Sequence, residues 1–385
     1  MKTAAVICEY NPFHYGHKYH LDRTREAGAT HIVAVMSGNF TQRGDVAVFD
    51  KYARAKTALQ NGADLVLELP ARYSLMPAEA FARGAAEIIT ALNCIDMLSF
   101  GSESGSIDAL KEAASAVEYV SHTEEFFRSL KDGKSYPAAL QDALREYYTP
   151  DVSEVIMSPN NTLAIEYIAA LDNLGSRIEL FTAGRIGAGH DSASEKDSFA
   201  SASFIRKKIL AGEDYFDFAP AENEPSADIM RLERAILAKL RTFSEEDFDR
   251  IFDCANGLGD RLRKAVRRAG SLNELYFLTK TKRYTLARIR RAVLSGFLGL
   301  DKDFAREPAA YIRILGMNKR GREILAAAKC SLPVDTSLKA LSGASAAAFR
   351  QANFEARCGD IYSLAFENPL PCGREFTAKP VILDD

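Results

Sequence analysis

The residues that decide the fold are Ala4-Ala5-Val6-Ile7-Cys8-Glu9-Tyr10-Asn11-Pro12-Phe13-His14-Tyr15-Gly16-His17. Residues 4–9 form a short, mostly apolar run, which predicts a buried first strand. A loop with two histidines around Gly16 follows, and residues 17–26 have the pattern of a helix. His-x-Gly-His between an apolar strand and a helix is typical of an α/β domain that binds a phosphate where the strand ends.

Strands and helices alternate through the first half of the chain. Further strands are predicted over residues 31–36, 64–69, 96–100 and 178–182, and helices over 51–60, 78–92, 107–120, 136–148 and 162–174. Short apolar strands that alternate with helices predict a parallel sheet covered on both faces. Such sheets bind ligands at the carboxyl ends of their strands, where the strand order reverses.

The pattern changes after Gly212, where the strand signals stop. Helices are predicted over residues 227–242, 244–252, 259–269, 271–279, 285–298 and 303–314. The stretch 219–226, with Pro220 and Pro225, indicates a linker. We therefore expect an α/β domain over residues 1–218 and a mostly helical domain over residues 219–385.

The net charge of −3 hides an uneven distribution of charge. Residues 261–322 hold 17 basic and four acidic side chains, a net +13, so the remainder of the chain carries −16. This surplus favours a polyanionic partner such as nucleic acid over an ordinary solvated helical surface. The basic residues expected to contact RNA phosphates are Lys282, Arg283, Arg288 and Arg291, and the last two share a helix face by their spacing.

Several classes of protein are excluded by composition. Apolar residues make up 47% of the chain and charged residues 26%, which is ordinary for a globular protein. No run approaches the roughly 18 apolar residues of a membrane span, and the first apolar run is too short for a signal peptide. The six cysteines form no C-x-x-C pair, so we expect no zinc site, free thiols and a cytoplasmic location.

The helix that follows His14 is expected to offer free N–H groups and a partial positive charge, both of which suit a phosphate. His14 and His17 are expected to donate hydrogen bonds to oxygens of an α-phosphate as negative charge builds there. Gly101, after the fourth strand, presents a backbone N–H to a nucleotide or forms an ordinary turn. Ser201, Ser203 and Arg206 form either a second phosphate site or an ordinary capped helix.

The motifs 14–17 and 201–206 resemble those of the nucleotidyltransferase superfamily. Five segments narrow this resemblance to the bacterial tRNA(Met) cytidine acetate ligase family. They are Glu9-Tyr10-Asn11-Pro12-Phe13-His14, Met36-Ser37-Gly38-Asn39-Phe40-Thr41-Gln42-Arg43-Gly44, Phe100-Gly101-Ser102-Glu103, Pro159-Asn160-Asn161 and Thr281-Lys282-Arg283-Tyr284-Thr285. The resemblance covers nearly the whole chain. It implies a Rossmann-like nucleotidyltransferase domain followed by a basic, helical, tRNA-binding domain.

The resemblance also implies an activity and an ATP site. Members of this family form acetyl-adenylate from acetate and ATP, and transfer the acetyl group to N4 of the wobble cytidine of elongator tRNA(Met). One departure from the family is Gly187-Ala188-Gly189-His190, where a Tyr is expected before the His. The implied ATP site comprises Ile7, Cys8, Glu9, Tyr10, Asn11, Pro12, Phe13, His14, Tyr15, Gly16, His17, Lys18, Tyr19, His20, Gly101, Asn160 or Asn161, Arg185, Ser201 and Ser203.

His14, His17 and Arg206 are the expected catalytic residues. Ser37, Gln42 and Arg43 are expected to line the substrate pocket, where Arg43 holds acetate, places the cytidine or is a solvated loop charge. Mg²⁺ is expected on the triphosphate, although no cluster of carboxylates in the sequence indicates a metal site formed by the protein. No acetyl-CoA signature stands out, which favours free acetate as the donor. The alternatives are a small-molecule adenylyltransferase and a non-catalytic RNA-binding protein.

Overall fold

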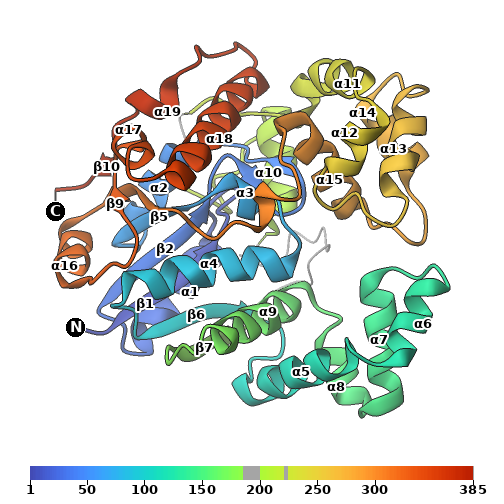
Figure 1. Cartoon of the computed structure of the whole chain (residues 1–385). Helices are drawn as coiled ribbons and strands as arrows, with labels where there is room; N and C mark the ends of the chain where they lie inside the picture. The colour runs from blue at the N-terminus through green and yellow to red at the C-terminus, as the bar shows by residue number, and fades with distance from the viewer. Residues whose placement is uncertain (185–199, 221–223, 385) are drawn as a thin grey trace.

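The structure of this chain is a computed structural model that describes residues 1–184, 200–220 and 224–384. Its centre is a twisted sheet covered by helices (Figure 1). The five predicted strands are all present and run parallel in the order β5-β2-β1-β6-β7. They are β1 (Thr3–Cys8), β2 (His31–Ser37), β5 (Leu65–Leu69), β6 (Met97–Ser102) and β7 (Glu179–Gly184).

Both faces of the sheet are buried at its centre, as the apolar strands predict. Every residue of β2 and of β5 is buried, and alternate side chains point to opposite faces. Val33 and Val35 join the apolar cluster on the side of α4 (Ala78–Leu92). Ile32, Ala34 and Met36 join the cluster that contains Leu21 of α1 (Tyr15–Glu26). The two clusters confirm an α/β layer structure.

Most predicted helices are present with shifts of a few residues at their ends. In the first half the remaining helices are α1 (Tyr15–Glu26), α2 (Lys51–Gln60), α3 (Ala71–Ser74), α5 (Ile107–Val120), α6 (Glu124–Lys131), α7 (Tyr136–Tyr147), α8 (Pro150–Val155), α9 (Pro159–Asn173) and α10 (Ala202–Ala211). In the second half they are α11 (Glu233–Arg241), α12 (Glu245–Arg250), α13 (Leu258–Val266), α14 (Leu272–Thr279), α15 (Leu286–Leu298), α16 (Lys319–Ala327), α17 (Leu338–Ser342), α18 (Ala346–Tyr362) and α19 (Arg374–Thr377). Short 3₁₀ turns are η1 (Ile229–Leu232), η2 (Phe304–Arg306) and η3 (Ser363–Ala365). The helices that the sequence patterns above do not predict are α3, α6, α8 and α16–α19.

The second half also contributes strands, so the expectation that strands stop after Gly212 is wrong. The helix predicted over residues 303–314 is wrong as well. That stretch holds η2 and the start of β8 (Ile312–Met317), which pairs antiparallel with β5. β9 (Val334–Asp335) and β10 (Val381–Ile382) both pair with β8. The sheet is therefore mixed, and the chain returns to it after the basic helices.

A buried group of charges explains why the sequence of β8 does not indicate a strand. Arg313 on β8 is 1% exposed, and its guanidinium is ion-paired with Glu68 on β5 and Glu375 on α19. Lys51 on α2 is ion-paired with the same two carboxylates at 2.6 and 2.7 Å. In the sequence alone, a charged residue within an apolar run suggests a helix with one exposed face. Here the opposite charges on other elements allow it to be buried.

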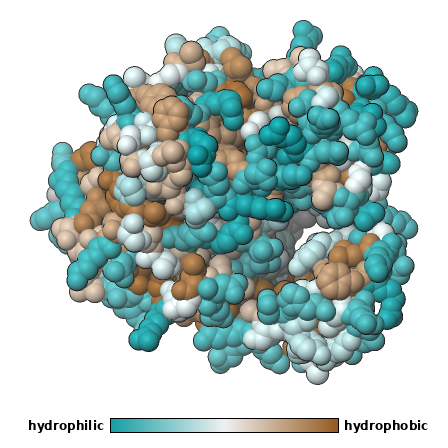
Figure 2. Space-filling model, in the orientation of Figure 1, coloured by the Kyte–Doolittle hydropathy of each residue, from teal (hydrophilic) through white to brown (hydrophobic). Residues whose placement is uncertain are grey.

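Two groups of helices form lobes beside the sheet. Helices α5–α8 form one lobe, and α11–α15 form another on the same side of the molecule (Figure 1). On the face seen in Figure 2, a hollow separates the two lobes. The division of the chain at residue 218 stays a prediction. Among the described residues, no helix is long and apolar enough to cross a bilayer.

Candidate active site

The candidate site lies at the carboxyl ends of β1, β2 and β6. The strand order reverses between β1 and β6, because β2 lies on one side of β1 and β6 on the other. This is the position where open parallel sheets bind ligands. Residues 9–14, after β1, carry the chain to the start of α1, and Asn11–Pro12 is a cis peptide bond.

The two histidines build the start of α1 together. His14 is the N-cap residue, and its Nδ1 accepts a hydrogen bond from the Gly16 N–H at 3.1 Å. His17 Nδ1 accepts from the His14 N–H at 3.2 Å, which completes a capping box. The two rings stack with their centroids 3.7 Å apart. Because each Nδ1 accepts, the proton of each neutral ring lies on Nε2, which makes Nε2 a hydrogen-bond donor.

The prediction of free N–H groups at the start of this helix is wrong. The Tyr15 N–H donates to the carbonyl oxygen of Phe218, and the Gly16 N–H to His14 Nδ1. The N–H groups of His17 and Lys18 both donate to the His14 carbonyl oxygen. The cap therefore occupies the backbone donors that an isolated helix end would offer. The hydrogen-bond donors that the His-x-Gly-His motif adds are therefore the Nε2 atoms of the two imidazoles.

Arg206 joins the second motif to the first. Its Nη1 donates to the carbonyl oxygen of Asn11 at 2.8 Å, so α10 is held against the loop between β1 and α1. Ser201 caps α10 and accepts from the Phe204 N–H, and its hydroxyl lies 3.0 Å from that of Ser203. The predicted capped helix is confirmed, and the tertiary fold brings Arg206 to the same loop as the two histidines.

Glu9 connects this loop to the one after β2. Its Oε1 accepts a hydrogen bond from the backbone N–H of Gln42 at 2.7 Å. Burial raises the pKa of Glu9, while the Gln42 hydrogen bond and the charges of Arg206 and Arg43 oppose that rise. The two loops therefore meet around a half-buried carboxyl group.

Arg54 on α2 is a residue that the sequence analysis missed. It is fully buried, and its guanidinium donates to four backbone carbonyl oxygens, those of Phe49, Glu9, Ser37 and Gly38. It thereby fixes the ends of β1 and β2 relative to each other. Nothing in the pattern of α2 distinguishes Arg54 from a solvated arginine, so only its tertiary contacts reveal this role.

The segment after β2 is a hairpin of β3 (Phe40–Thr41) and β4 (Asp45–Val46) whose tip packs on α15. Gly44 has φ +73°, and a Cβ there would lie 2.5 Å from the backbone nitrogen of Arg291, so only glycine fits. Arg291 Nη1 donates to the Gln42 carbonyl oxygen. Arg43 is exposed at the hairpin tip, whereas the Ser37 hydroxyl is buried and has no hydrogen-bond partner among the described residues.

Arg288 and Arg291, predicted on one RNA-binding face, do share a face, but it is turned inward. Both are ion-paired with Asp253, at 3.0 and 3.2 Å, and the Arg291 side chain is 8% exposed. Burial lowers the pKa of Arg291, and Asp253 opposes that change. Lys282, in contrast, is exposed in the loop before α15, and Arg283 beside it is partly exposed.

The loop after β6 is tied to the start of α9. Asn161 is buried, and its Oδ1 accepts from the N–H groups of Glu103 and Ser104 while its Nδ2 donates to Val155. Asn160 is more exposed, and its Nδ2 donates to the Glu103 carboxylate at 2.6 Å. Gly101 lies on β6, paired with Ala183 of β7. Arg185 and the segment 187–190 lie outside the described residues.

The other residues predicted for the ATP site are mostly turned toward the protein. His20 Nε2 lies 2.9 Å from the Ser99 hydroxyl, and burial lowers the pKa of His20 to about 4. Burial also raises the pKa of the Cys8 thiol. Lys18 is ion-paired with Asp22 on the same helix. Tyr10 and Phe13 are buried and pack edge to face.

Comparisons with known proteins agree with this geometry. Residues 1–374 match the family described as HIGH Nucleotidyl Transferase. The tRNA(Met) cytidine acetate ligase of Fervidobacterium nodosum is 36% identical over 351 residues, which cover 86% of this chain and 82% of that protein. The apo crystal structure of Thermotoga maritima TmcAL superimposes with a TM-score of 0.93 at 31% identity, and all of both chains is covered. The same protein with α-thio-ATP bound gives a TM-score of 0.91 at 31% identity, also over all of both chains.

Proposed function

Since this chain belongs to the HIGH Nucleotidyl Transferase family and, within it, to the tRNA(Met) cytidine acetate ligases, we propose that it acetylates N4 of the wobble cytidine of elongator tRNA(Met) at the expense of ATP. The observation that carries this proposal is the full-length likeness to a relative whose structure holds α-thio-ATP. The location of His14 and His17 at the reversal of strand order supports it. We place the reaction in the cytoplasm, where ATP and tRNA are available.

The proposed reaction has two steps. In the first, an oxygen of acetate forms a bond to the α-phosphorus of ATP, and the bond from that phosphorus to pyrophosphate breaks. Pyrophosphate leaves with the electron pair, and acetyl-adenylate remains. In the second, N4 of cytidine forms a bond to the acetyl carbon, the bond from that carbon to AMP breaks, and N4 loses a proton. Both steps need reactants held in line and stabilisation of negative charge on phosphate oxygens.

His14, His17 and Arg206 are proposed to stabilise that charge. Each imidazole has its proton on Nε2, because its Nδ1 accepts within the capping box. The cap thus orients two donors before ATP arrives, which is the preorganisation that electrostatic catalysis requires. Arg206 supplies a fixed positive charge on the loop that leads to His14. Ser201 and Ser203 are proposed to contact the same phosphates from the start of α10.

Asn160 is the better candidate of the two asparagines for a contact with ATP. Asn161 uses both ends of its amide on backbone groups of the protein. Asn160 is more exposed and bonds to the side chain of Glu103, which a ligand can displace with less disturbance of the backbone. Gly101 and Arg185 stay proposed ATP contacts on the strength of the family resemblance.

The hairpin after β2 is proposed to hold the acetyl acceptor and donor. Arg43 is exposed at its tip and is the group that would pair with the carboxylate of acetate. The Ser37 hydroxyl, which has no hydrogen-bond partner among the described residues, lies at the base of this hairpin, and Gln42 lies in its turn beside Arg43. Glu9 and Arg54 hold this hairpin against the ATP loop, so the two substrates meet in one place.

Mg²⁺ is proposed to arrive with the triphosphate. Among the described residues, no group of three His, Cys, Asp or Glu side chains could hold a metal ion. The protein side chains therefore do not form a metal site of their own in that part of the chain, and no step is assigned to a protein-bound metal.

The tRNA is proposed to bind along the basic helices of the second half. Lys282 and Arg283 lie at the surface before α15, where they can reach phosphates. Arg288 and Arg291 are ion-paired with Asp253. We therefore assign the direct phosphate contacts to Lys282 and Arg283. Arg288 and Arg291 are assigned a supporting role for the hairpin that packs on α15.

One experiment separates this function from the two alternatives. The protein is incubated with ATP and labelled acetate, with and without total tRNA, and label in acetyl-adenylate and in tRNA is measured. A tRNA(Met) cytidine acetate ligase labels the tRNA. A small-molecule adenylyltransferase labels neither product, and a non-catalytic RNA-binding protein binds tRNA without consuming ATP. Absence of label in tRNA would overturn the proposal.

A further inference from the structure

Phe277 on α14 is 80% exposed, the largest exposed fraction of the big apolar side chains that the structure describes. The residue before it, Tyr276, is buried, and the guanidinium of Arg290 lies 5.5 Å from the centre of its ring. One ring therefore anchors α14 to α15, while the neighbouring ring faces solvent. A single exposed apolar side chain is ordinary in itself. Phe277 differs from the others in its surroundings.

The stretch of chain around Phe277 is strongly basic. Residues 261–283 contain eight basic side chains and a single acid, Glu274, and one of the eight, Arg263, is ion-paired with Glu245 and Asp260 outside the stretch. The carboxylate of Glu274 accepts from the N–H of Gly270 at 2.8 Å, so it is engaged within its own turn. Lys280, the C-cap residue of α14, follows Phe277 by three residues, and its Nζ donates to the carbonyl oxygens of Thr281 and Tyr284. On the face seen in Figure 2 the surface over this lobe is mostly hydrophilic. This charge suits a polyanion.

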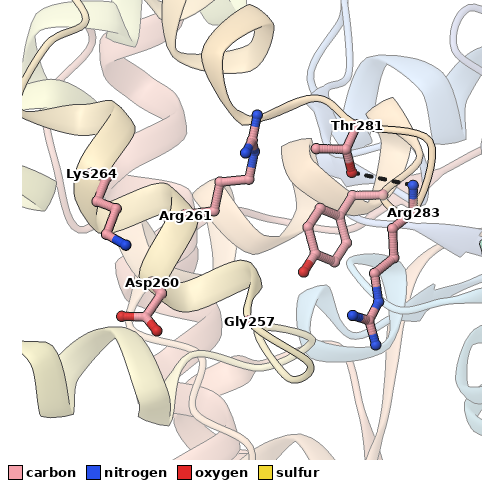
Figure 3. Close-up of a pocket in the computed structure, with 7 residues that line it drawn as sticks. Gly257, Asp260, Arg261, Lys264, Thr281 and Arg283 are labelled. Atoms are coloured by element: carbon pink, nitrogen blue, oxygen red, sulfur yellow. Dashed lines mark hydrogen bonds between the residues drawn. The ribbon is translucent and has the colours of Figure 1, made fainter. Parts of the chain in front are cut away.

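A basic pocket adjoins the end of α14. It has a volume of about 330 Å³ and lies between α13 and the segment that follows α14. Lys264 and Arg283 lie on opposite sides of it, with Asp260 and Gly257 between them (Figure 3). Arg261 Nε donates to the carbonyl oxygen of Thr279 at 2.7 Å, two residues beyond Phe277. That hydrogen bond fastens the cations of α13 to the helix end that carries the ring.

We propose that Phe277 stacks on an unpaired base of the tRNA, while the adjoining cations, Lys264 and Arg283 among them, hold phosphates of the same strand. This inference rests on the proposed function and deepens it. An aromatic ring among cations is the arrangement that binds single-stranded nucleic acid, because every base has a face on which a ring can stack. The centre of a protein–protein interface is instead depleted of charge. The observations therefore favour RNA over a protein partner.

The test compares Phe277→Ala, Phe277→Leu and Phe277→Trp in the full chain. Binding is measured with a tRNA(Met) transcript and with a fully paired RNA duplex. The Ala and Leu variants should bind the tRNA roughly five- to hundredfold more weakly, the range expected for loss of a stacked base, and the Trp variant should bind like wild type. Binding of the duplex should not change, because it offers no unpaired base. The salt dependence of tRNA binding should also stay unchanged, because no phosphate contact is lost.

Phe349→Ala is the matched control. Phe349 is 59% exposed on α18, outside the 261–283 stretch, and its removal should leave tRNA binding unchanged. Wild-type tRNA affinity of Phe277→Ala, or of Phe277→Leu, would overturn the inference. An equal loss of duplex binding in these variants would also overturn it. A changed sedimentation coefficient of these variants with unchanged tRNA affinity would overturn it too, because it would identify a contact between two copies of the chain. A wild-type protein that forms acetyl-adenylate but binds no tRNA would instead contradict the proposed function.

Discussion

The guanidinium of Arg206 donates a hydrogen bond from Nη1 to the carbonyl oxygen of Asn11 at 2.8 Å, although 195 residues separate them in the chain. Burial lowers the pKa of Arg206, and the charges of Asp45 and Glu9 oppose that change. An arginine keeps its charge even when partly buried. The hydrogen bond therefore places a permanent positive charge on the loop that ends at His14. The following predictions test what this arrangement and its surroundings do.

Replacing His14 or His17 with Ala should lower the rate of acetylation at saturating ATP by at least about a hundredfold. The physical reason is the loss of a donor to the charge that develops on the α-phosphate, a loss comparable to removal of an oxyanion-hole donor. The rate is measured with labelled acetate and tRNA. A loss of about tenfold or less in a variant that remains folded would contradict this role.

His14 also caps α1, so its two roles must be separated. Ala at this position should destabilise the protein by about 1 kcal/mol through loss of the cap. His14→Asn is the control, because Asn is a good N-cap residue but lacks the imidazole Nε2 donor. Stability should recover in the Asn variant while activity stays low. Recovery of activity along with stability would mean that the cap alone matters.

Arg43→Ala should raise the KM for acetate by about tenfold or more, because a hydrogen bond between charged partners contributes about 1.5–3 kcal/mol. The KM for ATP should not change. Initial rates of adenylate formation at varied acetate concentration give the answer without tRNA. If only the KM for tRNA rises, Arg43 places the cytidine instead, and if no constant moves, it is a solvated loop charge.

Gly44→Ala should displace the hairpin from α15 and reduce acetylation, because a Cβ at this position would overlap the backbone of Arg290 and Arg291. Gly28→Ala is the matched control. Gly28 has φ +97° and nothing within 4 Å of its would-be Cβ, so it reports backbone strain alone. Both variants are compared by kcat/KM and melting temperature. Equal losses in the two would show that packing of the hairpin on α15 has no part in the reaction.

Changing Lys282 and Arg283 together to Ala should weaken binding of matched and unmatched tRNAs alike, because phosphate contacts position RNA without reading its bases. The salt dependence of binding should flatten by up to about two ion equivalents. Formation of acetyl-adenylate should persist, since the ATP loop is untouched. Wild-type affinity and salt slope in the double variant would mean that the RNA surface lies elsewhere.

Glu355 should make stability fall as pH rises. Its Oε1 accepts from the Ala71 N–H, and burial raises its pKa to about 8, against an ordinary value near 4.5. The folded state therefore holds this proton more tightly than the unfolded chain does. Its contribution to the free energy of unfolding is complete below about pH 4.5 and declines as pH rises to about 8.

The neutral variant Glu355→Gln isolates this effect. Wild type should lose stability relative to the Gln variant between pH 5 and pH 8, as measured by urea unfolding at several pH values. A difference between the two proteins that is flat, or that grows in favour of wild type with pH, would show that the carboxylate is charged in the folded protein.

Local patterns predicted most of the elements that position the site. The alternation of apolar runs and amphipathic stretches placed the five parallel strands, because a strand buried on both faces must be apolar throughout. Cap residues such as Ser201 and Thr285 placed helix starts within a few residues. The His-x-Gly-His and Ser-x-Ser-x-Ile-Arg motifs each lie within a few consecutive residues, so the sequence alone indicates them.

Predictions failed where a residue's partner lies far away in the chain. The start of β8 lies in the predicted helix 303–314, and Arg313 on this strand is buried only because Glu68 and Glu375 on other elements neutralise its charge. Arg291 was predicted at the RNA surface by helical spacing, yet Asp253 and the Gln42 carbonyl bind it inside. The free N–H groups expected at the start of α1 are bonded, in part to Phe218.

The sequence by itself determined the α/β layers, the two motifs and the basic character of the second half, because these depend on periodicity, caps and composition within short windows. The tertiary structure alone decided which charges are buried and which face solvent. It also decided that Arg54 fixes the ends of β1 and β2, that α15 supports the hairpin, and that Phe277 is exposed to solvent. Burial and pairing of charges depend on distances in space, which spacing along the chain does not encode.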